Sequence, residues 1–364
     1  MVRFPSTLRS TAITARVGTV LGICFAICFV TGMLSHYQYH PWAWLPEPAT
    51  PSWGYRLTQG VHVTTGIATI PLLLVKLWSV YPRLFQLPAV RSLAHGLERA
   101  SIAVLVSSAL VELVTGFFNV LNWYPWPWPF VPVHRFLGYM VFGALLVHVA
   151  VKLPVIQSAL RSPLAADERA TGLSRRGLLA AAGAGIGMVV VTNVGQSITS
   201  LEDVGLLAVR RTRDATEQHL PVNKTAARAG VARVPADWTL AVDGPRPFSL
   251  GLAELESLAT QEAELPIACV EGWSANAHWH GLPLLAVVTR AGGDSGSRVR
   301  VASLERHGAY RHSYVEGPQL AHALLATHLN GARLDLDHGY PVRLIAPDRA
   351  GVLNTKWLAK VEIL

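Results

Sequence analysis

Residues 268–274 of this 364-residue chain read Ala-Cys-Val-Glu-Gly-Trp-Ser, and they decide how its second half is interpreted. Cys269 is the only cysteine in that half, because Cys24 and Cys28 lie in an apolar N-terminal stretch. A lone cysteine cannot form a disulfide within its own domain. It is therefore a packed thiol, a nucleophile or a single thiolate ligand to a metal, and its surroundings choose among these roles.

Outward from this stretch, the composition divides the chain into an apolar part and a more ordinary part. The hydrophobic fraction is 51% and the mean hydropathy is +0.33, which is high for a soluble protein. The additional hydrophobic residues lie in residues 1–200, whereas residues 201–364 have the composition of a soluble domain. The net charge of +8 predicts no nucleic-acid partner, because most arginines of the first half flank apolar segments as membrane topology requires.

Five apolar stretches are long enough to cross a bilayer, the fifth being rich in Ala and Gly. They run from Val17 to Leu34, Val61 to Tyr81, Ala100 to Leu121, Phe136 to Ile156 and Gly177 to Val194. Arginines gather in the N-terminal tail and in the loops after the second and fourth stretches, whereas the other loops are rich in Trp, Tyr and Pro. The positive-inside rule then predicts a multi-pass protein of the cytoplasmic membrane, with its N-terminus in the cytoplasm and its C-terminal domain outside.

The first four spans contain an internal repeat. Val-Thr-Gly ends the first span at 30–32 and the third at 114–116, and His-x-x-x-Gly opens the second at His62 and the fourth at His134. Repeats of this kind place their shared site at the repeat interface. We therefore expect two histidines at equal depth on facing helices.

Two such histidines are what axial haem ligation requires. Residues 1–160 resemble the four-helix membrane cytochromes b (b561-like) that exchange electrons with quinones, which implies haem b held by His62 and His134. His148 lies fourteen residues after His134 on one helix face, a spacing that suits a second haem toward the cytoplasm. His95 is the only obvious partner for it, because the repeat places Lys76 at the matching position. The alternative is that these histidines hydrogen-bond within the bundle or face lipid headgroups.

The fifth span follows an arginine pair. Leu-Ser-Arg-Arg-Gly-Leu-Leu at 173–179 precedes an Ala/Gly-rich core, and this resembles a twin-arginine export signal. The alternative is ordinary positive-inside charge at Arg175 and Arg176. We expect the span to remain as an anchor, and the export machinery to carry a domain that receives its cofactor in the cytoplasm.

The C-terminal region predicts an α+β domain. Short apolar runs broken by Gly and Pro, such as Trp238 to Val242, Val299 to Ser303 and Val342 to Ala346, indicate strands. Leu252 to Leu258 and Leu320 to Leu329 are expected to be helical.

Several motifs in this region follow one order. They are Cys-Val-Glu-Gly-Trp-Ser at 269–274, Trp-His-Gly-Leu-Pro-Leu at 279–284, His-Gly-Tyr-Pro-Val-Arg-Leu at 338–344, Gly351, and Lys-Trp at 356–357. In order and spacing, over about 130 residues, they resemble the molybdopterin-binding domain of the sulfite oxidase family. The resemblance implies that Cys269 binds molybdenum beside the pterin dithiolene, and a soft thiolate suits that metal.

The same resemblance implies further site residues. His338, Arg343 and Lys356 would hold the pterin phosphate, and Asn223 with Lys224 fall where the family places an N-terminal pterin-binding segment. Tyr310 stands at a place similar to the substrate-side tyrosine and would donate a proton or hydrogen bond. The alternatives are solvated strand charges for Arg343 and Lys356, a turn residue for His338 and a structural tyrosine for Tyr310.

One departure bears on the substrate. Sulfite oxidases follow the cysteine with Gly-Asn-Arg, whose arginine helps to bind sulfite, whereas Glu-Gly-Trp-Ser follows here. This favours a sulfoxide-type reductase over a sulfite oxidase.

Together these features predict three parts: a four-helix cytochrome b-like domain (1–160), a linker with the arginine pair and an anchor helix (161–200), and an extracytoplasmic α+β molybdopterin-binding domain (201–364). The expected function is oxo-transfer on a small substrate, with electrons exchanged with the quinone pool through haem b. The alternative is a non-catalytic pterin- or partner-binding domain on a membrane cytochrome b or sensor.

Overall fold

The computed structural model describes residues 9–42, 44–88, 90–162, 174–194, 199–205 and 218–364. The chain divides into two compact units. The first holds most of the long helices. The second joins the segment Met33–Gly60, which includes the end of the first helix and the start of the second, to the C-terminal domain.

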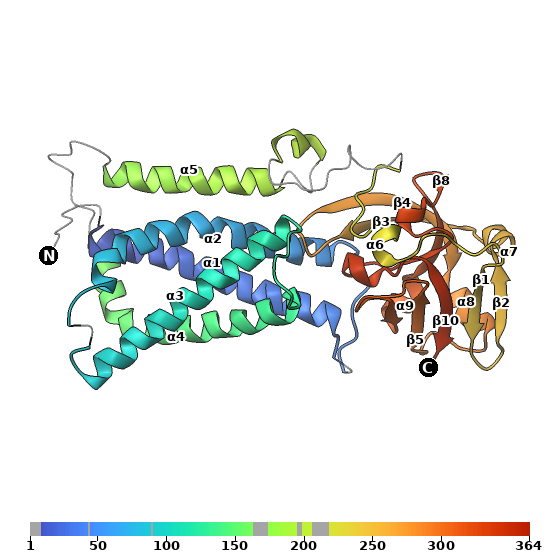
Figure 1. The fold of residues 1–364 in the computed structure, drawn as a ribbon, viewed down its shortest axis with the longest axis horizontal. Coiled ribbons are helices and arrows are strands. Elements are labelled where there is room, and N and C mark those ends of the chain that lie inside the picture. Colours follow the sequence, from blue (N-terminus) through green and yellow to red (C-terminus); the bar gives the residue numbers. More distant parts are fainter. Residues whose placement is uncertain (1–8, 43, 89, 163–173, 195–198, 206–217) are drawn as a thin grey trace. The chain divides into compact units, whose positions relative to one another are not determined.

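Five helices among the described residues are long and apolar enough to cross a membrane, with mean hydropathies between 1.6 and 2.3 over their most apolar windows. They are coloured from blue to yellow-green in Figure 1: α1 (Thr11–Tyr39), α2 (Gly54–Leu84), α3 (Leu93–Val120), α4 (Phe130–Arg161) and α5 (Arg175–Val194). Their length and composition indicate a membrane protein, and the five spans expected from the sequence all coincide with these helices.

The helical unit has its own apolar core. Residues from four helices make it, including Leu21 of α1, Leu72 of α2, Ala109 of α3 and Val141 of α4, and Ile186 of α5 packs against it. Many other large apolar side chains on these helices are exposed, among them Val30, Leu74, Leu146 and Met188. Apolar side chains on the outside of a bundle suit a lipid environment.

The C-terminal domain contains two sheets, and the predicted α+β class is confirmed. The first has the order β2-β1-β10-β5-β6; the second runs β3-β4-β7-β8, with β9 also paired to β7. All pairs are antiparallel except β1 with β10. The strands are β1 (Thr239–Asp243), β2 (Phe248–Gly251), β3 (Gln261–Ala268), β4 (Ser274–Pro283), β5 (Val299–Ser303), β6 (His312–Val315), β7 (Leu324–Leu329), β8 (Ala332–Arg333), β9 (Arg343–Ile345) and β10 (Leu358–Ile363).

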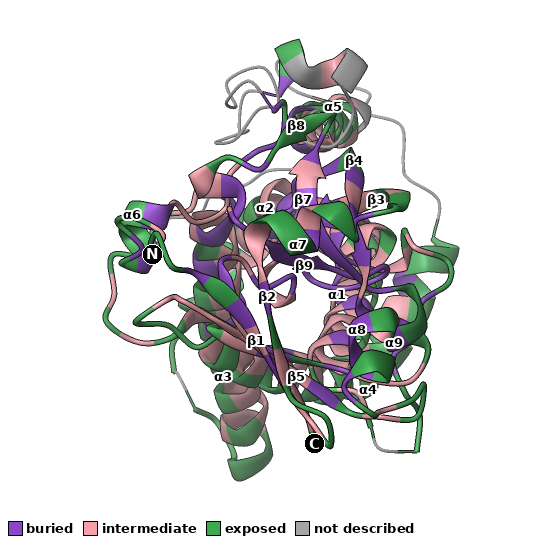
Figure 2. Cartoon of the chain, turned by 90° about the vertical axis from the view of Figure 1, so that its right-hand side faces the viewer, coloured by how far each residue is buried: buried purple, intermediate pink, exposed green. Residues whose placement is uncertain are grey.

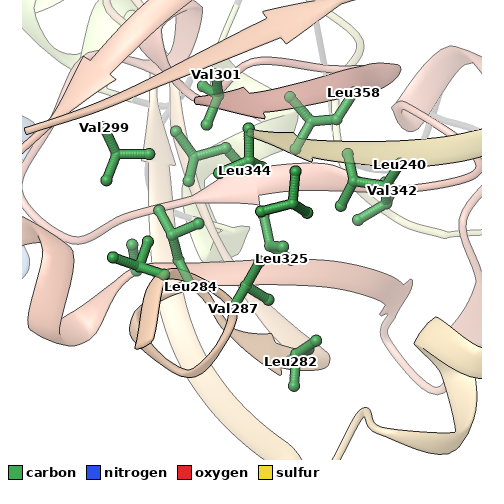
Figure 3. Packing of buried hydrophobic residues seen from close by; sticks show 14 of the residues in the cluster. Leu240, Leu282, Leu284, Val287, Val299, Val301, Leu325, Val342, Leu344 and Leu358 are labelled. Atoms are coloured by element: carbon green, nitrogen blue, oxygen red, sulfur yellow. The ribbon is translucent and has the colours of Figure 1, made fainter. Parts of the chain in front are cut away.

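Short helices connect these strands. The α-helices are α6 (Ala226–Ala229), α7 (Leu252–Ser257), α8 (Leu284–Arg290) and α9 (Pro318–His322); the 3₁₀ turns are η2 (Thr199–Val204), η3 (Leu336–His338) and η4 (Gly351–Leu353). Between the sheets lies the main core, to which Leu240 and Leu358 contribute from the first sheet and Leu325 and Leu344 from the second (Figure 3).

The strand β7 of the second sheet is buried on both faces. Leu325 of β7 points into the main core, whereas Leu324 and Ala326 belong to a second cluster with Cys269, Trp273 and Trp279. Figure 2 shows buried residues along these central strands and exposed residues on short helices such as α7. The helix expected over Leu320–Leu329 is therefore wrong beyond its first residues, because a strand buried on both faces has a continuous apolar run that resembles a buried helix.

Candidate functional site

Cys269 lies in the tight connection between β3 and β4. Its backbone N–H donates to the Trp273 carbonyl at 2.9 Å, and Gly272 N–H donates to the Cys269 carbonyl at 3.0 Å. Gly272 has a φ of 97°, a conformation that favours glycine. Cys269 is 2% exposed, so the turn holds it in the interior of the domain.

A second close approach fixes this turn from the other side. Ala268 forms a parallel bridge with Ala350, and a Cβ at Gly351 would lie 2.9 Å from the Ala268 carbonyl oxygen. Only glycine fits at that distance. The absence of a side chain at Gly351 therefore allows the backbone at Ala350 and Gly351 to lie directly against the start of the Cys269 turn.

Three of the expected pterin-binding residues lie together. Arg343 Nη1 donates to the His338 carbonyl at 2.9 Å, and Lys356 Nζ donates to the Asp337 carbonyl at 2.8 Å. Gly339 has a φ of 109°, and a Cβ there would lie 3.1 Å from the Cβ atoms of both Arg343 and Lys356. The His-Gly pair is therefore the turn that lets both cationic side chains approach.

This cluster is strongly electropositive and buried. Arg343 is 2% exposed, and its Nε is buried without a hydrogen-bond partner. Among the described residues it has no carboxylate within ion-pair distance, and burial lowers its pKa to about 9. Burial, with the charges of Arg343 and Lys356, lowers the pKa of His338 to about 3. Carbonyl oxygens and the Trp279 ring are the partners of the Arg343 guanidinium among the described residues. A nearby anion would stabilise this buried cation, so the residues present fit an anionic cofactor group.

Asn223 and Lys224 reach the same neighbourhood through the backbone. The Lys224 carbonyl accepts from Lys356 Nζ at 3.0 Å, and Asn223 Oδ1 accepts from Lys224 N–H at 2.9 Å. The Lys224 ammonium forms an ion pair with Glu305. The Lys224 charge is thus paired with a protein carboxylate. The contact of this segment with Lys356 is made by the Lys224 backbone carbonyl.

Tyr310 lies in the turn between β5 and β6 and is 37% exposed. Partial burial raises the pKa of the Tyr310 hydroxyl above its ordinary value. Its ring lies 6.2 Å from that of Tyr39, at the end of α1. Tyr39 lies in no motif that marks it as a site residue. A second such tyrosine, Tyr55, also lies beside the Cys269 turn, where it packs with Ala268.

In the helical unit, the two expected histidines meet. The ring centroids of His62 and His134 are 6.2 Å apart. That is close to the separation of two imidazoles on opposite sides of one metal ion, since each metal–nitrogen bond is about 2 Å long. His62 Nδ1 contacts the Cys28 carbonyl at 2.9 Å and Thr31 Oγ1 at 3.2 Å, so these contacts involve Nδ1 and not Nε2.

The internal repeat is visible in these contacts. Thr115 Oγ1 lies 3.4 Å from His134 Nδ1, as Thr31 does from His62. Cβ atoms at Gly32 and Gly116 would approach the respective histidine Cε1 atoms at 3.2 and 3.3 Å. The paired Thr-Gly motifs thus orient the two rings, and the residues present fit a haem held between them.

One acidic side chain intervenes. Glu112 Oε1 lies 3.2 Å from His134 Nε2, the atom that would bind iron, so haem binding requires this contact to be released. His148 lies among Lys76, Lys152 and Glu98. His95 Nδ1 accepts from the Arg91 backbone N–H at the start of α3, so the structure adds no support for a pairing of these two histidines.

Comparison with known proteins places the C-terminal domain. Residues 226–364 match the family described as oxidoreductase molybdopterin binding domain. The chain is 32% identical over 144 residues to the protein-methionine-sulfoxide reductase catalytic subunit MsrP of Xanthomonas axonopodis pv. citri (strain 306), covering 35% of this chain and 45% of that protein. It is 33% identical over 180 residues to sulfite oxidase of Gallus gallus, covering 41% and 38%.

A third relative is the MsrP of Gluconobacter oxydans (strain 621H), 31% identical over 149 residues, with coverage of 36% and 48%. The chain thus spans less than half the length of each of these relatives. Their similarity confirms the expectation of a sulfite oxidase-type domain after the helices. Residues 226–364 thus match the oxidoreductase molybdopterin binding domain family, and five helices long and apolar enough to span a membrane precede them among the described residues.

Proposed function

We propose that this protein is a membrane-bound molybdenum-dependent oxidoreductase that carries out oxo-transfer on a small substrate outside the cytoplasm. The observation that carries the proposal is the buried Cys269 thiol on its fixed turn, in a domain whose interior also holds Arg343 without a carboxylate. Thiolate for the metal and a cation for the pterin phosphate are the two groups that a bound molybdopterin requires.

When bound, the cofactor supplies the two-electron chemistry that moves an oxygen atom between substrate and water. The chain's own residues hold and orient it: Cys269 as the metal thiolate, and His338, Arg343 and Lys356 around the phosphate. Asn223 and Lys224 supply backbone contacts, and Tyr310 donates a hydrogen bond on the substrate side. A sulfoxide-type reductase is favoured over a sulfite oxidase, because no arginine follows Cys269 within its turn.

Electrons are proposed to reach this domain from the quinone pool through haem b. The support is the 6.2 Å separation of the His62 and His134 rings and their matching Thr-Gly surroundings. His148 remains a prediction for a second haem. The proposed topology has five spans in the cytoplasmic membrane, with Arg175 and Arg176 read by the twin-arginine machinery. The backbone of this pair begins α5, but their side chains lie outside the described residues.

Metal, pterin and haem analysis of the purified full chain tests the proposal. We expect about one molybdenum and one pterin per chain and a haem b spectrum. A screen of oxo compounds for reoxidation of the reduced haem then identifies the substrate. Haem without molybdenum would instead support a cytochrome that carries a non-catalytic domain, and molybdenum without haem would remove the quinone part.

A further inference from the structure

The segment Met33–Gly60, which connects the first two spans, is fixed to the C-terminal domain by hydrogen bonds. The Asp348 carboxyl accepts from the Tyr55 backbone N–H and from Gln38 Nε2, the latter at 3.1 Å. Gln319 Nε2 donates to the Pro48 carbonyl at 2.7 Å. These contacts lie within one compact unit, so the segment is part of the surface around the Cys269 turn.

Two further contacts reach the turn itself. Gln59 Nε2 donates to the Val270 carbonyl at 3.0 Å, directly after Cys269, and Arg56 Nη1 donates to Asn276 Oδ1 at 2.8 Å. The first turns of α2 therefore run along the β3–β4 connection. The side of α2 that carries Arg56 and Gln59 is therefore held beside the Cys269 turn.

Three tyrosines meet at this place. The Tyr39 ring lies 6.2 Å from Tyr55 and 6.2 Å from Tyr310, edge to face in both cases. Tyr55 is 1% exposed and packs with Ala268 and Ala350, which flank the Cys269 turn. The Cys269 thiol lies close enough to Tyr39 and Tyr55 to interact with both electrostatically.

The Tyr55 hydroxyl is buried beside the hydroxyls of Tyr39 and Ser35, and it interacts with both. It meets the geometry of an ordinary hydrogen bond with neither of them. A bound oxygen acceptor would therefore improve the hydrogen bonding of this buried group. Tyr310, which is partly exposed, extends the group toward solvent.

We propose that Tyr39 and Tyr55, together with Tyr310, form the substrate-binding wall of the Cys269 site. Their hydroxyls donate hydrogen bonds to the oxygen of the substrate and position it beside the cofactor. Neutral donors suit an uncharged oxygen acceptor, so the substrate class is a sulfoxide or a similar neutral oxide. This inference rests on the proposed function. It assigns a direct part in substrate binding to the segment Met33–Gly60, which contains Tyr39 and Tyr55.

The test uses the molybdenum-loaded full chain with Tyr39→Phe and Tyr55→Phe. Tyr37→Phe is the matched control, because its hydroxyl donates to the Leu45 and Pro46 carbonyls and its ring contacts Trp42 instead. We expect each test variant to raise the KM for dimethyl sulfoxide about 3- to 10-fold, the effect of losing one neutral hydrogen bond. We expect kcat to change less, and the control to match the wild type.

A second readout does not depend on turnover. Dimethyl sulfone, a neutral oxygen acceptor that is much harder to reduce than a sulfoxide, is titrated while the electron paramagnetic resonance signal of molybdenum(V) is recorded. The line shape should change with the ligand in the wild type and the Tyr37 variant, and require several-fold more ligand in the Tyr39 variant. The Tyr39 variant carries the test alone if Tyr55→Phe fails to fold, since Tyr39 is only partly buried.

Unchanged KM and unchanged titration in Tyr39→Phe and in any folded Tyr55→Phe, at full molybdenum content, would overturn the inference and leave the proposed function intact. Loss of molybdenum from the test variants would also overturn it, by assigning these residues to cofactor retention. Absence of molybdenum from the wild type would instead refute the proposed function.

Discussion

Asp348→Asn tests how the connecting segment is held on the C-terminal domain. The Asp348 side chain is buried, and its Oδ1 accepts hydrogen bonds from Tyr55 N–H and Gln38 Nε2. Asn keeps an oxygen acceptor at this position and tolerates the φ of 50° found there. The substitution therefore removes the ionisable group and preserves the hydrogen bonds.

Two effects on this carboxyl oppose each other. Burial raises the pKa of Asp348, whereas the Tyr55 N–H at the start of α2 lowers it; burial is larger, and the pKa is about 6 against an ordinary 3.8. The folded chain thus keeps a proton that the unfolded chain releases, and its stability falls as pH rises from about 4 to about 6. The difference between about 6 and 3.8 corresponds to roughly 3 kcal/mol, or about 1–2 kcal/mol after solvent screening of this loop.

Unfolding of the detergent-solubilised full chain, followed by tryptophan fluorescence in denaturant, measures this contribution. We expect Asp348→Asn to match the wild type within about 1 kcal/mol at pH 4 and to be more stable by about 1–2 kcal/mol at pH 8. Asp243→Asn is the control, because Asp243 is a half-exposed strand residue that pairs with Lys360. A variant less stable than the wild type at pH 8 would refute the reasoning, because the helix N-terminus would then outweigh burial.

The remaining predictions concern the three proposed functional parts. Cys269→Ser should abolish turnover and leave the haem spectrum unchanged, since a hydroxyl is a poor substitute for a thiolate on molybdenum; full activity would contradict that role. His62→Ala and His134→Ala should each remove the haem absorption while activity with an artificial soluble donor persists, and native haem content in both would disprove the pairing. Replacing Arg175 and Arg176 together by Lys keeps their charge but should leave the C-terminal domain in the cytoplasm; unchanged protease accessibility from outside would reject the export signal.

Much of the architecture could be predicted because its signals are local. Apolar length alone marks the five spans, and short apolar runs separated by Gly and Pro mark β1 and β5. The strand β7 could not be predicted in this way, because both of its faces are buried and its apolar run has no period of two. Its identity depends on its partners β4 and β9, which are distant in sequence.

The candidate site likewise contains residues that local motifs indicate and residues that only the fold brings to it. Motifs with fixed spacing are enough to propose Cys269, His338, Arg343 and Lys356 as candidate site residues, and the structure brings the last three together. Tyr39 and Tyr55 could not, since aromatic residues beside a span also match an interfacial belt facing lipid headgroups. Only the fold shows that this aromatic segment packs against the Cys269 turn.

The buried Arg343 connects the proposed cofactor to the proposed route of export. Without an anion, its guanidinium lies in the interior with one nitrogen unpartnered, a state that destabilises the folded domain. A ligand that binds only the folded state stabilises it according to its concentration relative to Kd, so cofactor loading favours the compact form. In the proposed function the cofactor is inserted in the cytoplasm, before the domain crosses the membrane. A machinery that carries folded domains would preserve this arrangement. The proposed export signal at the start of α5 and the buried Arg343, which has no carboxylate partner among the described residues, then both require the cofactor to be inserted before export.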